Sequence, residues 1–71
     1  MFITLTNAHP DHKGNPIAIK KELIVVVYPT VMMRPNGIGE QVTIVHCPPH
    51  GSWEVEESFE DVIDMMSWNA L

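Results

Sequence analysis

Residues 23–28 read Leu-Ile-Val-Val-Val-Tyr, the longest unbroken apolar run of this 71-residue chain. The run has no polar face, and such a run is typical of a strand covered on both sides. Pro29 follows, and because proline cannot donate to a strand ladder, we expect the strand to end there. One cover is the core of the domain. The second cover is the C-terminal helix, a barrel closed on itself or another copy of the protein.

Shorter strand patterns flank this run. Residues 2–6 alternate in polarity, and residues 17–19 form a short strand that pairs back on them. Pro, Gly and Asn mark residues 7–16 and residues 30–39 as loops. Beyond them, residues 41–55 read as two further strands joined by a Pro-Pro-His-Gly turn.

The end of the chain has the pattern of a helix. Ser58 followed by Asp61 has the form of a capping box, and apolar residues recur after it at helical spacing. We therefore expect a mainly β (α+β) fold in a single domain, residues 1–71. The expected architecture is a five-stranded antiparallel meander curled into a small barrel-like sheet, with one C-terminal α-helix.

Composition limits the classes to which the chain can belong. Nine acidic residues against four Lys and Arg give a net charge of −5, with 45% apolar and 18% charged residues, as in a folded soluble domain. The single Cys47 excludes an internal disulfide, so a metal or self-association is left to support a thin core. The apolar runs are too short to span a bilayer, and residues 1–6 lack a signal-peptide pattern. We expect a cytoplasmic protein that binds no membrane.

Three segments carry a resemblance to a known family. They are the opening FITLTN, the stretch GNPIAIKKELIVVV (residues 14–27) and the closing WEVEESFEDVI (residues 53–63). Together they resemble small phage proteins and the FlbD-like flagellar family. The loops HPDH and HCPPH and the Met-Met-Arg-Pro stretch depart from that pattern. The resemblance implies a non-enzymatic accessory protein encoded by a phage, acting in the host cytoplasm.

Histidine and cysteine cluster in two places. The pairs His9-x-x-His12 and His46-Cys47-x-x-His50 contain zinc-ligand types at short spacing. In a meander, the first and fourth connections lie at opposite ends of the sheet, so these residues cannot share one ion within a chain. We expect no metal and no cofactor, with zinc as the alternative.

The same residues bear on catalysis. His46 and Cys47 are neighbours on a strand and point to opposite faces, although His50 could approach Cys47 across the turn. A thin domain offers no deep pocket that excludes water. We expect that the protein is not an enzyme.

Charge is divided unevenly along the chain. Residues 1–34 have a net charge of +2 and residues 35–71 of −7, with six of the acids between Glu54 and Asp64. Complementing the helix dipole and aiding solubility account for many of these acids. An electronegative rim that steers a basic partner is the functional alternative. Four Lys and Arg are too few for nucleic-acid binding. The rim candidates are Glu56, Glu57, Glu60 and Asp64.

Methionine and tryptophan supply candidate anchors for a partner. Trp68 lies about 180° around the helix from Phe59, so it should not join the same core, and Met65 also lies off the apolar stripe. A Trp folded back on its own sheet is the alternative. Trp and Met are enriched at interface cores. The candidate anchors are Trp68, Met65, Met32 and Met33.

These observations favour a small phage-type, non-enzymatic binding protein that docks on a host or defence protein and modulates or inhibits it. We also expect it to form a homo-oligomer. The alternative is a homo-oligomeric ligand-binding protein that sequesters a small nucleotide or a metal between subunits.

Overall fold

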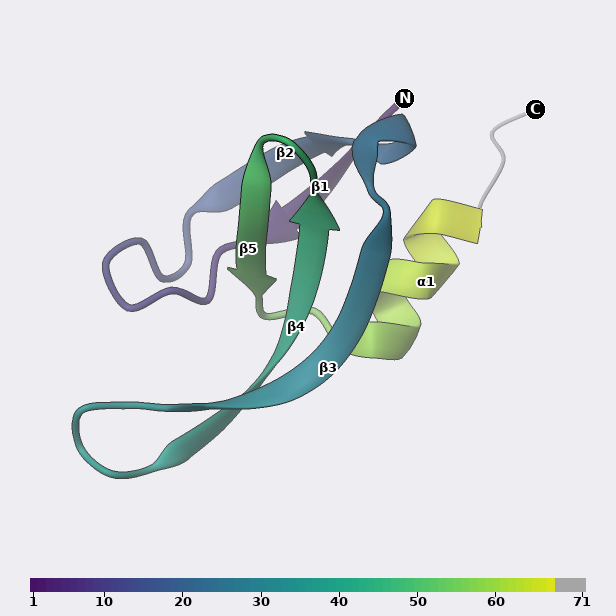
Figure 1. Cartoon of the computed structure of the whole chain (residues 1–71). Helices are drawn as coiled ribbons and strands as arrows, with labels where there is room; N and C mark the ends of the chain where they lie inside the picture. The colour runs from purple at the N-terminus through teal and green to yellow at the C-terminus, as the bar shows by residue number, and fades with distance from the viewer. Residues whose placement is uncertain (68–71) are drawn as a thin grey trace.

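A computed structural model describes residues 1–67 of the chain (Figure 1). The predicted mainly β fold with one C-terminal helix is confirmed. The elements are β1 (Phe2–Thr6), β2 (Pro16–Lys20), the 3₁₀ helix η1 (Lys21–Leu23), β3 (Val26–Met33), β4 (Gly39–Cys47), β5 (Gly51–Val55) and α1 (Phe59–Ser67). No helix among these residues is long and apolar enough to cross a membrane.

The strands form two antiparallel sheets instead of one meander. β1 pairs with β2, and β3, β4 and β5 form a three-stranded sheet in that order. β2 and β3 do not pair, because η1 turns the chain from one layer to the other between them (Figure 1). Instead, Asn7 at the end of β1 bridges to Val55 at the end of β5. Neither sheet closes into a barrel within residues 1–67, so the expected closed curl is not found.

The expected boundaries of the central apolar strand were wrong at both ends. Leu23 belongs to η1, and β3 begins at Val26 and continues through Pro29 to Met33. Proline is tolerated there because β3 is an edge strand, paired with β4 alone. The segment Thr30–Met33, expected as a loop, is therefore part of a long β3–β4 hairpin whose outer half projects as an arm (Figure 1).

The expectation that the apolar run is covered on both sides is also wrong for the described part of the chain. Val27 packs against the core, whereas Val25, Val26 and Tyr28 are exposed. Only one face of β3 meets the core. The apolar side chains on its second face are therefore exposed.

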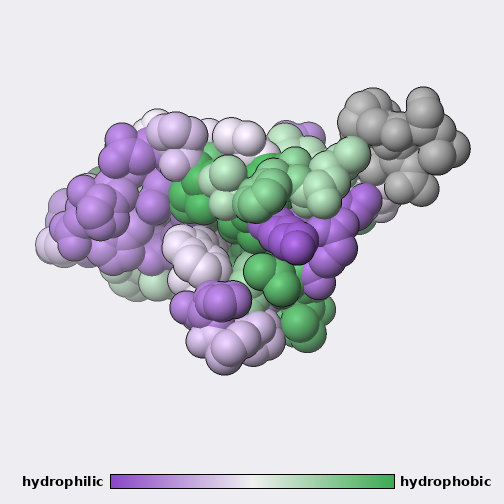
Figure 2. All heavy atoms as spheres, turned by 90° about the horizontal axis from the view of Figure 1, so that it is seen from above, coloured by the Kyte–Doolittle hydropathy of each residue, from purple (hydrophilic) through white to green (hydrophobic). Residues whose placement is uncertain are grey.

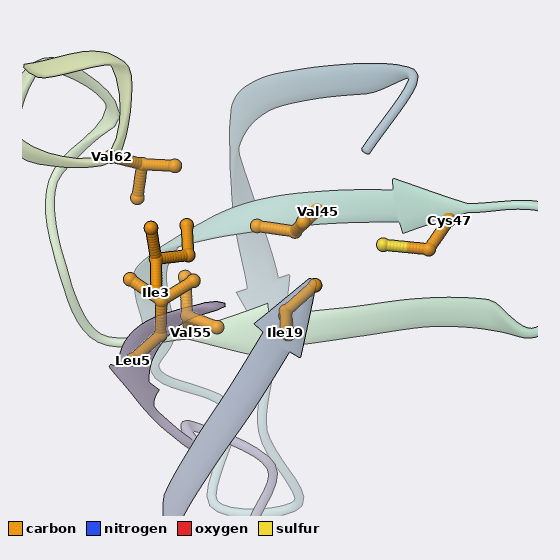
Figure 3. Close-up of a cluster of buried hydrophobic side chains, with 7 residues drawn as sticks. All are labelled: Ile3, Leu5, Ile19, Val45, Cys47, Val55 and Val62. Carbon is orange, nitrogen blue, oxygen red and sulfur yellow. The ribbon is translucent and has the colours of Figure 1, made fainter. Parts of the chain in front are cut away.

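The core lies between the two layers. Ile3 and Leu5 from β1 and Ile19 from β2 point toward Val45 on β4 and Val55 on β5 (Figure 3). The alternation in residues 2–6 therefore predicted the buried face of β1 correctly. Val62 of α1 closes one side, and Cys47 extends the cluster toward the β4–β5 turn.

The helix begins as the capping pattern predicted. The backbone N–H of Asp61 donates to Ser58 Oγ at 3.1 Å, and Val62 N–H donates to the carbonyl oxygen of Ser58. Val62 is the fully buried residue of the stripe. Met65, expected away from the core, is half-buried and packs against the core cluster beside Met66.

A junction of hydrogen bonds joins β1 to the end of β5. The carboxylate of Glu57 accepts from the backbone N–H and from Oγ1 of Thr6, both at 2.9 Å. The N–H of Glu56 donates to the carbonyl oxygen of Thr6, and Thr43 Oγ1 donates to the carbonyl oxygen of Glu57 at 2.7 Å. We call these contacts the β1–β5 junction. It fixes the start of α1 against both sheets.

Arg34, at the turn end of the hairpin arm, ties the arm to the rest of the molecule. Its guanidinium donates to Glu40 at 2.6 Å, to Glu54 at 3.0 Å and to the carbonyl oxygen of Ala8. Lys13 adds a second ion pair to Glu40 at 3.1 Å. Arg34 and Lys13 hold the pKa of Glu40 below its ordinary value of 4.5.

Replacing Glu57 by Ala tests the β1–β5 junction. The variant should lose about 2 kcal/mol of unfolding free energy, because two hydrogen bonds to a charged acceptor are removed. Urea denaturation monitored by Trp fluorescence measures the loss. The matched control is Glu56→Ala, whose side chain is exposed and which should change stability by less than about 0.5 kcal/mol. Equal effects of the two substitutions would contradict the junction.

Acidification tests the Arg34 contacts. Because the pKa of Glu40 is lowered in the folded state, its stabilisation is present above pH 4.5 and is lost as the pH falls through the folded pKa. Glu40→Gln should therefore lower the urea midpoint at pH 7 and should show a smaller further fall between pH 5 and pH 3 than the unaltered protein. Glu60→Gln, an exposed carboxylate, serves as the control. An acid-induced fall that is unchanged in Glu40→Gln would refute the linkage.

Candidate protein-docking surface

Exposed apolar side chains gather where the N-terminus and η1 meet. Met1, Phe2 and Leu23 are exposed, with Phe2 64% accessible although it lies in a strand. In the view from above, hydrophobic residues (green) lie across the middle of the molecule, with the largest group of hydrophilic residues (purple) to the left and smaller groups below and to the right (Figure 2). Two grooves flank Phe2.

The first groove runs between β1 and α1 and has a volume of about 450 Å³. We call it the β1–α1 groove. Phe2 and Met65 supply apolar walls, and Asp64 supplies a carboxylate at the rim. The structure thus places Met65 and Asp64, an expected anchor and an expected rim residue, in one groove with Phe2. The full lining is Met1, Phe2, Ile3, Thr4, Asp64 and Met65.

The second groove lies at the open end between the two layers, with a volume of about 380 Å³. Trp53 is half-buried there and packs against the core cluster from β5. The groove also reaches Cys47 and His50 at the β4–β5 turn. Its lining is Phe2, Ile17, Ala18, Ile19, Lys20, Leu23, Cys47, His50 and Trp53.

The expected acidic rim divides into two groups. Glu60 and Asp64 are exposed and lie four residues apart, on one face of α1. Glu56 is also exposed, just before the helix. The Glu57 carboxylate, in contrast, is bound to Thr6 in the β1–β5 junction. Three of the four predicted acids therefore present their charge to solvent.

The remaining expected anchors lie elsewhere. Met32 and Met33 are on the projecting part of β3, away from the β1–α1 groove (Figure 1). Met32 is half-buried against Ala8 and Val42, whereas Met33 is 69% exposed. Trp68 lies outside the described residues. The predicted anchors therefore do not form one surface among the residues that the structure describes.

The two histidine clusters are separated by the length of β5. The loop with His9 and His12 follows Ala8, whose N–H donates to the backbone carbonyl oxygen of Glu54 near the end of β5. Cys47 and His50 lie instead at the start of β5. His46 Nδ1 instead lies 2.6 Å from Ser52 Oγ across the ladder. Within residues 1–67, no group of three His, Cys, Asp or Glu side chains is placed to hold a metal ion.

The Cys47 thiol is built into the core. It is 2% accessible, and burial raises its pKa above the ordinary value. A nucleophilic cysteine requires a lowered pKa and access to solvent, because the thiolate is the reactive form. The site therefore lacks both conditions for covalent catalysis.

Phe2, which lines both grooves, was not among the predicted anchors. The signal was present: in the alternation of residues 2–6, Phe2 falls on the same face as Thr4 and Thr6. An aromatic side chain on the face that points away from the core is exposed, and its register opposite Lys20 places it at the open end of β1.

No protein-family model matches this chain, and no curated protein or solved structure matches it either.

Thiol labelling tests the environment of Cys47. With an excess of a maleimide at pH 8, the folded protein should label at least about 100-fold more slowly than the same protein in 6 M guanidinium chloride, because the thiol is buried and its pKa is raised. Mass spectrometry follows the reaction. Labelling of the folded protein at the denatured rate would show an accessible thiol and would favour the catalytic or metal-binding alternatives.

Proposed function

We propose that this protein is a non-enzymatic binding protein that docks on another protein through the β1–α1 groove and modulates or inhibits it. The resemblance of its strand and helix motifs to FlbD-like and small phage proteins supports a phage-type accessory role, with a host or defence protein as target. The observation that carries the proposal is the exposed Phe2 beside the groove that Met65 and Asp64 line.

Exposure of the Phe2 side chain to water costs free energy. A large aromatic side chain that is 64% accessible at the edge of an apolar groove loses contact with water when a partner covers it. Aromatic residues are enriched among the residues that dominate binding energy. Phe2 is therefore the proposed anchor of the interface.

Charge determines the kind of partner. Asp64 lies on the groove, and Glu60 lies one helical turn before it. Among residues 1–67 neither carboxylate has an ion-pair partner, and the chain as a whole carries a net charge of −5. A partner that places an apolar side chain in the groove and Lys or Arg beside it would match both features.

Selection of a displayed random peptide library against the immobilised protein tests this proposal. The enriched peptides should share a large apolar residue flanked by Lys or Arg. Phe2→Ala should weaken their binding about 30-fold, as expected for loss of a central anchor, mainly through faster dissociation. The control is Ile38→Ala, a side chain of similar exposure (65%) on the hairpin arm, which should bind normally.

A charge reversal tests the rim separately. Asp64→Lys should slow association with the selected peptides and reduce its dependence on salt, whereas Asp11→Lys, the same change in an exposed loop, should not. Enriched peptides without basic residues, or normal binding by Phe2→Ala, would refute the proposed interface.

A further inference from the structure

We infer that the outer edge of β3 is a self-association surface at which two copies of the chain pair antiparallel, around a two-fold axis at Val31. This inference is independent of the β1–α1 groove. It rests on the direction of the backbone groups of β3, on the absence of charge along the strand and on a groove that faces the same edge.

The backbone of the arm shows which groups are free to pair. Arg34 N–H donates to the carbonyl oxygen of Ile38 at 3.1 Å, next to the register pair Met33–Gly39. Bonding direction alternates along an antiparallel ladder, so Met32 and Thr30 also bond toward β4. The N–H and C=O groups of Val31 and Met33 therefore point away from β4, and within residues 1–67 no strand pairs with them on that side.

Proline fixes where a second strand can be added. Pro29 shares the outward direction of Val31, so its missing N–H costs β3 no bond to β4. With the axis at Val31, Val31 faces Val31 of the second copy and Pro29 faces Met33 of the second copy. This register makes two bonds between the valines and one at each Pro29–Met33 pair, with Met33 as donor. It uses every outward donor of Val31 and Met33.

The side chains of this edge favour a second copy over a charged partner. No charged residue occurs from Leu23 to Met33, although the whole chain carries a net charge of −5. Two identical acidic chains repel each other least where their contact surface is uncharged. Native edge strands are protected by charged residues, especially Lys, or by Pro. This part of β3 has no charged residue, and the register above accommodates Pro29. Val31 and Met33 are 61% and 69% exposed.

The neighbouring groove adds to the contact that the paired strands make. Five paired residues cover on the order of 170 Å² per copy, against the roughly 600 Å² per partner of the smallest specific interfaces. A groove of about 430 Å³ lies between β3 and the start of α1, with Pro29, Thr43 and Phe59 in its lining. Three acids, Glu56, Glu57 and Glu60, also line it, so the uncharged part of the contact is the strand itself. Directly opposed residues share a sheet face, so Met33 of the second copy lies on the same face as Pro29, over this groove. The contact is reciprocal, as two-fold symmetry requires.

Light scattering at several protein concentrations provides the first test. The chain should have twice its 8.0 kDa mass, and Val31→Lys should raise the dissociation constant of the dimer at least about tenfold, because the two lysines face each other across the axis. Ile38→Lys introduces the same charge at a residue of similar exposure outside the ladder and should remain dimeric. A monomer at all concentrations, or a dimer unaffected by Val31→Lys, overturns the inference.

Disulfide trapping tests the register. In an antiparallel hydrogen-bonded pair the Cα atoms lie about 5.5 Å apart, within the range that a disulfide spans. Val31→Cys should therefore cross-link to a dimer under mild oxidation. Met33→Cys, which is similarly exposed, should not, because in this register it lies four residues away from Met33 of the second copy. Cys47 is buried and should leave the unaltered protein uncross-linked. Preferential cross-linking of Met33→Cys would overturn the axis at Val31.

Failure of this inference is distinguishable from failure of the proposed function. Val31→Lys should still bind the selected peptides, because Val31 lies on the arm and the β1–α1 groove does not include it. Phe2→Ala should keep the dimer mass. A single variant that abolishes both peptide binding and dimerisation without unfolding would show that one surface does both, and would overturn the separation proposed here.

Discussion

The junction between β1 and β5 is the constraint on which the rest of this structure depends. The two layers share no continuous sheet, so the hairpin of β1 and β2 is held to the three-stranded sheet by the Asn7–Val55 bridge, the Thr6–Glu57 hydrogen bonds and the small core between them. Glu57 also begins the turn into α1. The Glu57 carboxylate therefore contributes both to the relative position of the two layers and to the direction of the helix that covers their side.

A thin core leaves a large share of the apolar side chains at the surface. Small domains bury a smaller fraction of their surface than large ones. Among residues 1–67, ten hydrophobic residues are buried, while Phe2, Val31 and Met33 are among those exposed. These exposed residues lie in two regions, around Phe2 and along the outer part of β3. The first region has an acidic rim, whereas residues 23–33 of the second carry no charge. This difference in charge is the physical basis for assigning a basic partner to one and a second copy to the other.

Much of the local structure could be predicted from the sequence, because local patterns determine it. The alternation in residues 2–6, the turn before Gly51 and the cap at Ser58 each act over a few residues and were all found. The errors concerned residues 23–33, the side chain of Met65 and the arrangement of the strands, which form two sheets instead of one curled meander. An apolar run on an edge strand has the same pattern as a run buried on both faces, and proline is compatible with an edge strand but not with a central one. Strand order therefore decided what the local pattern could not.

The candidate site shows the same division. The sequence by itself determined the presence of five strands and a C-terminal helix, the buried face of β1 and the concentration of acids near the helix. Only the tertiary structure decided that Glu57 is engaged with Thr6, that Met65 and Asp64 share a groove with Phe2 and that β3 has an open edge. The physical reason is that each of these features depends on contacts between residues far apart in the chain, which periodicity and spacing do not encode.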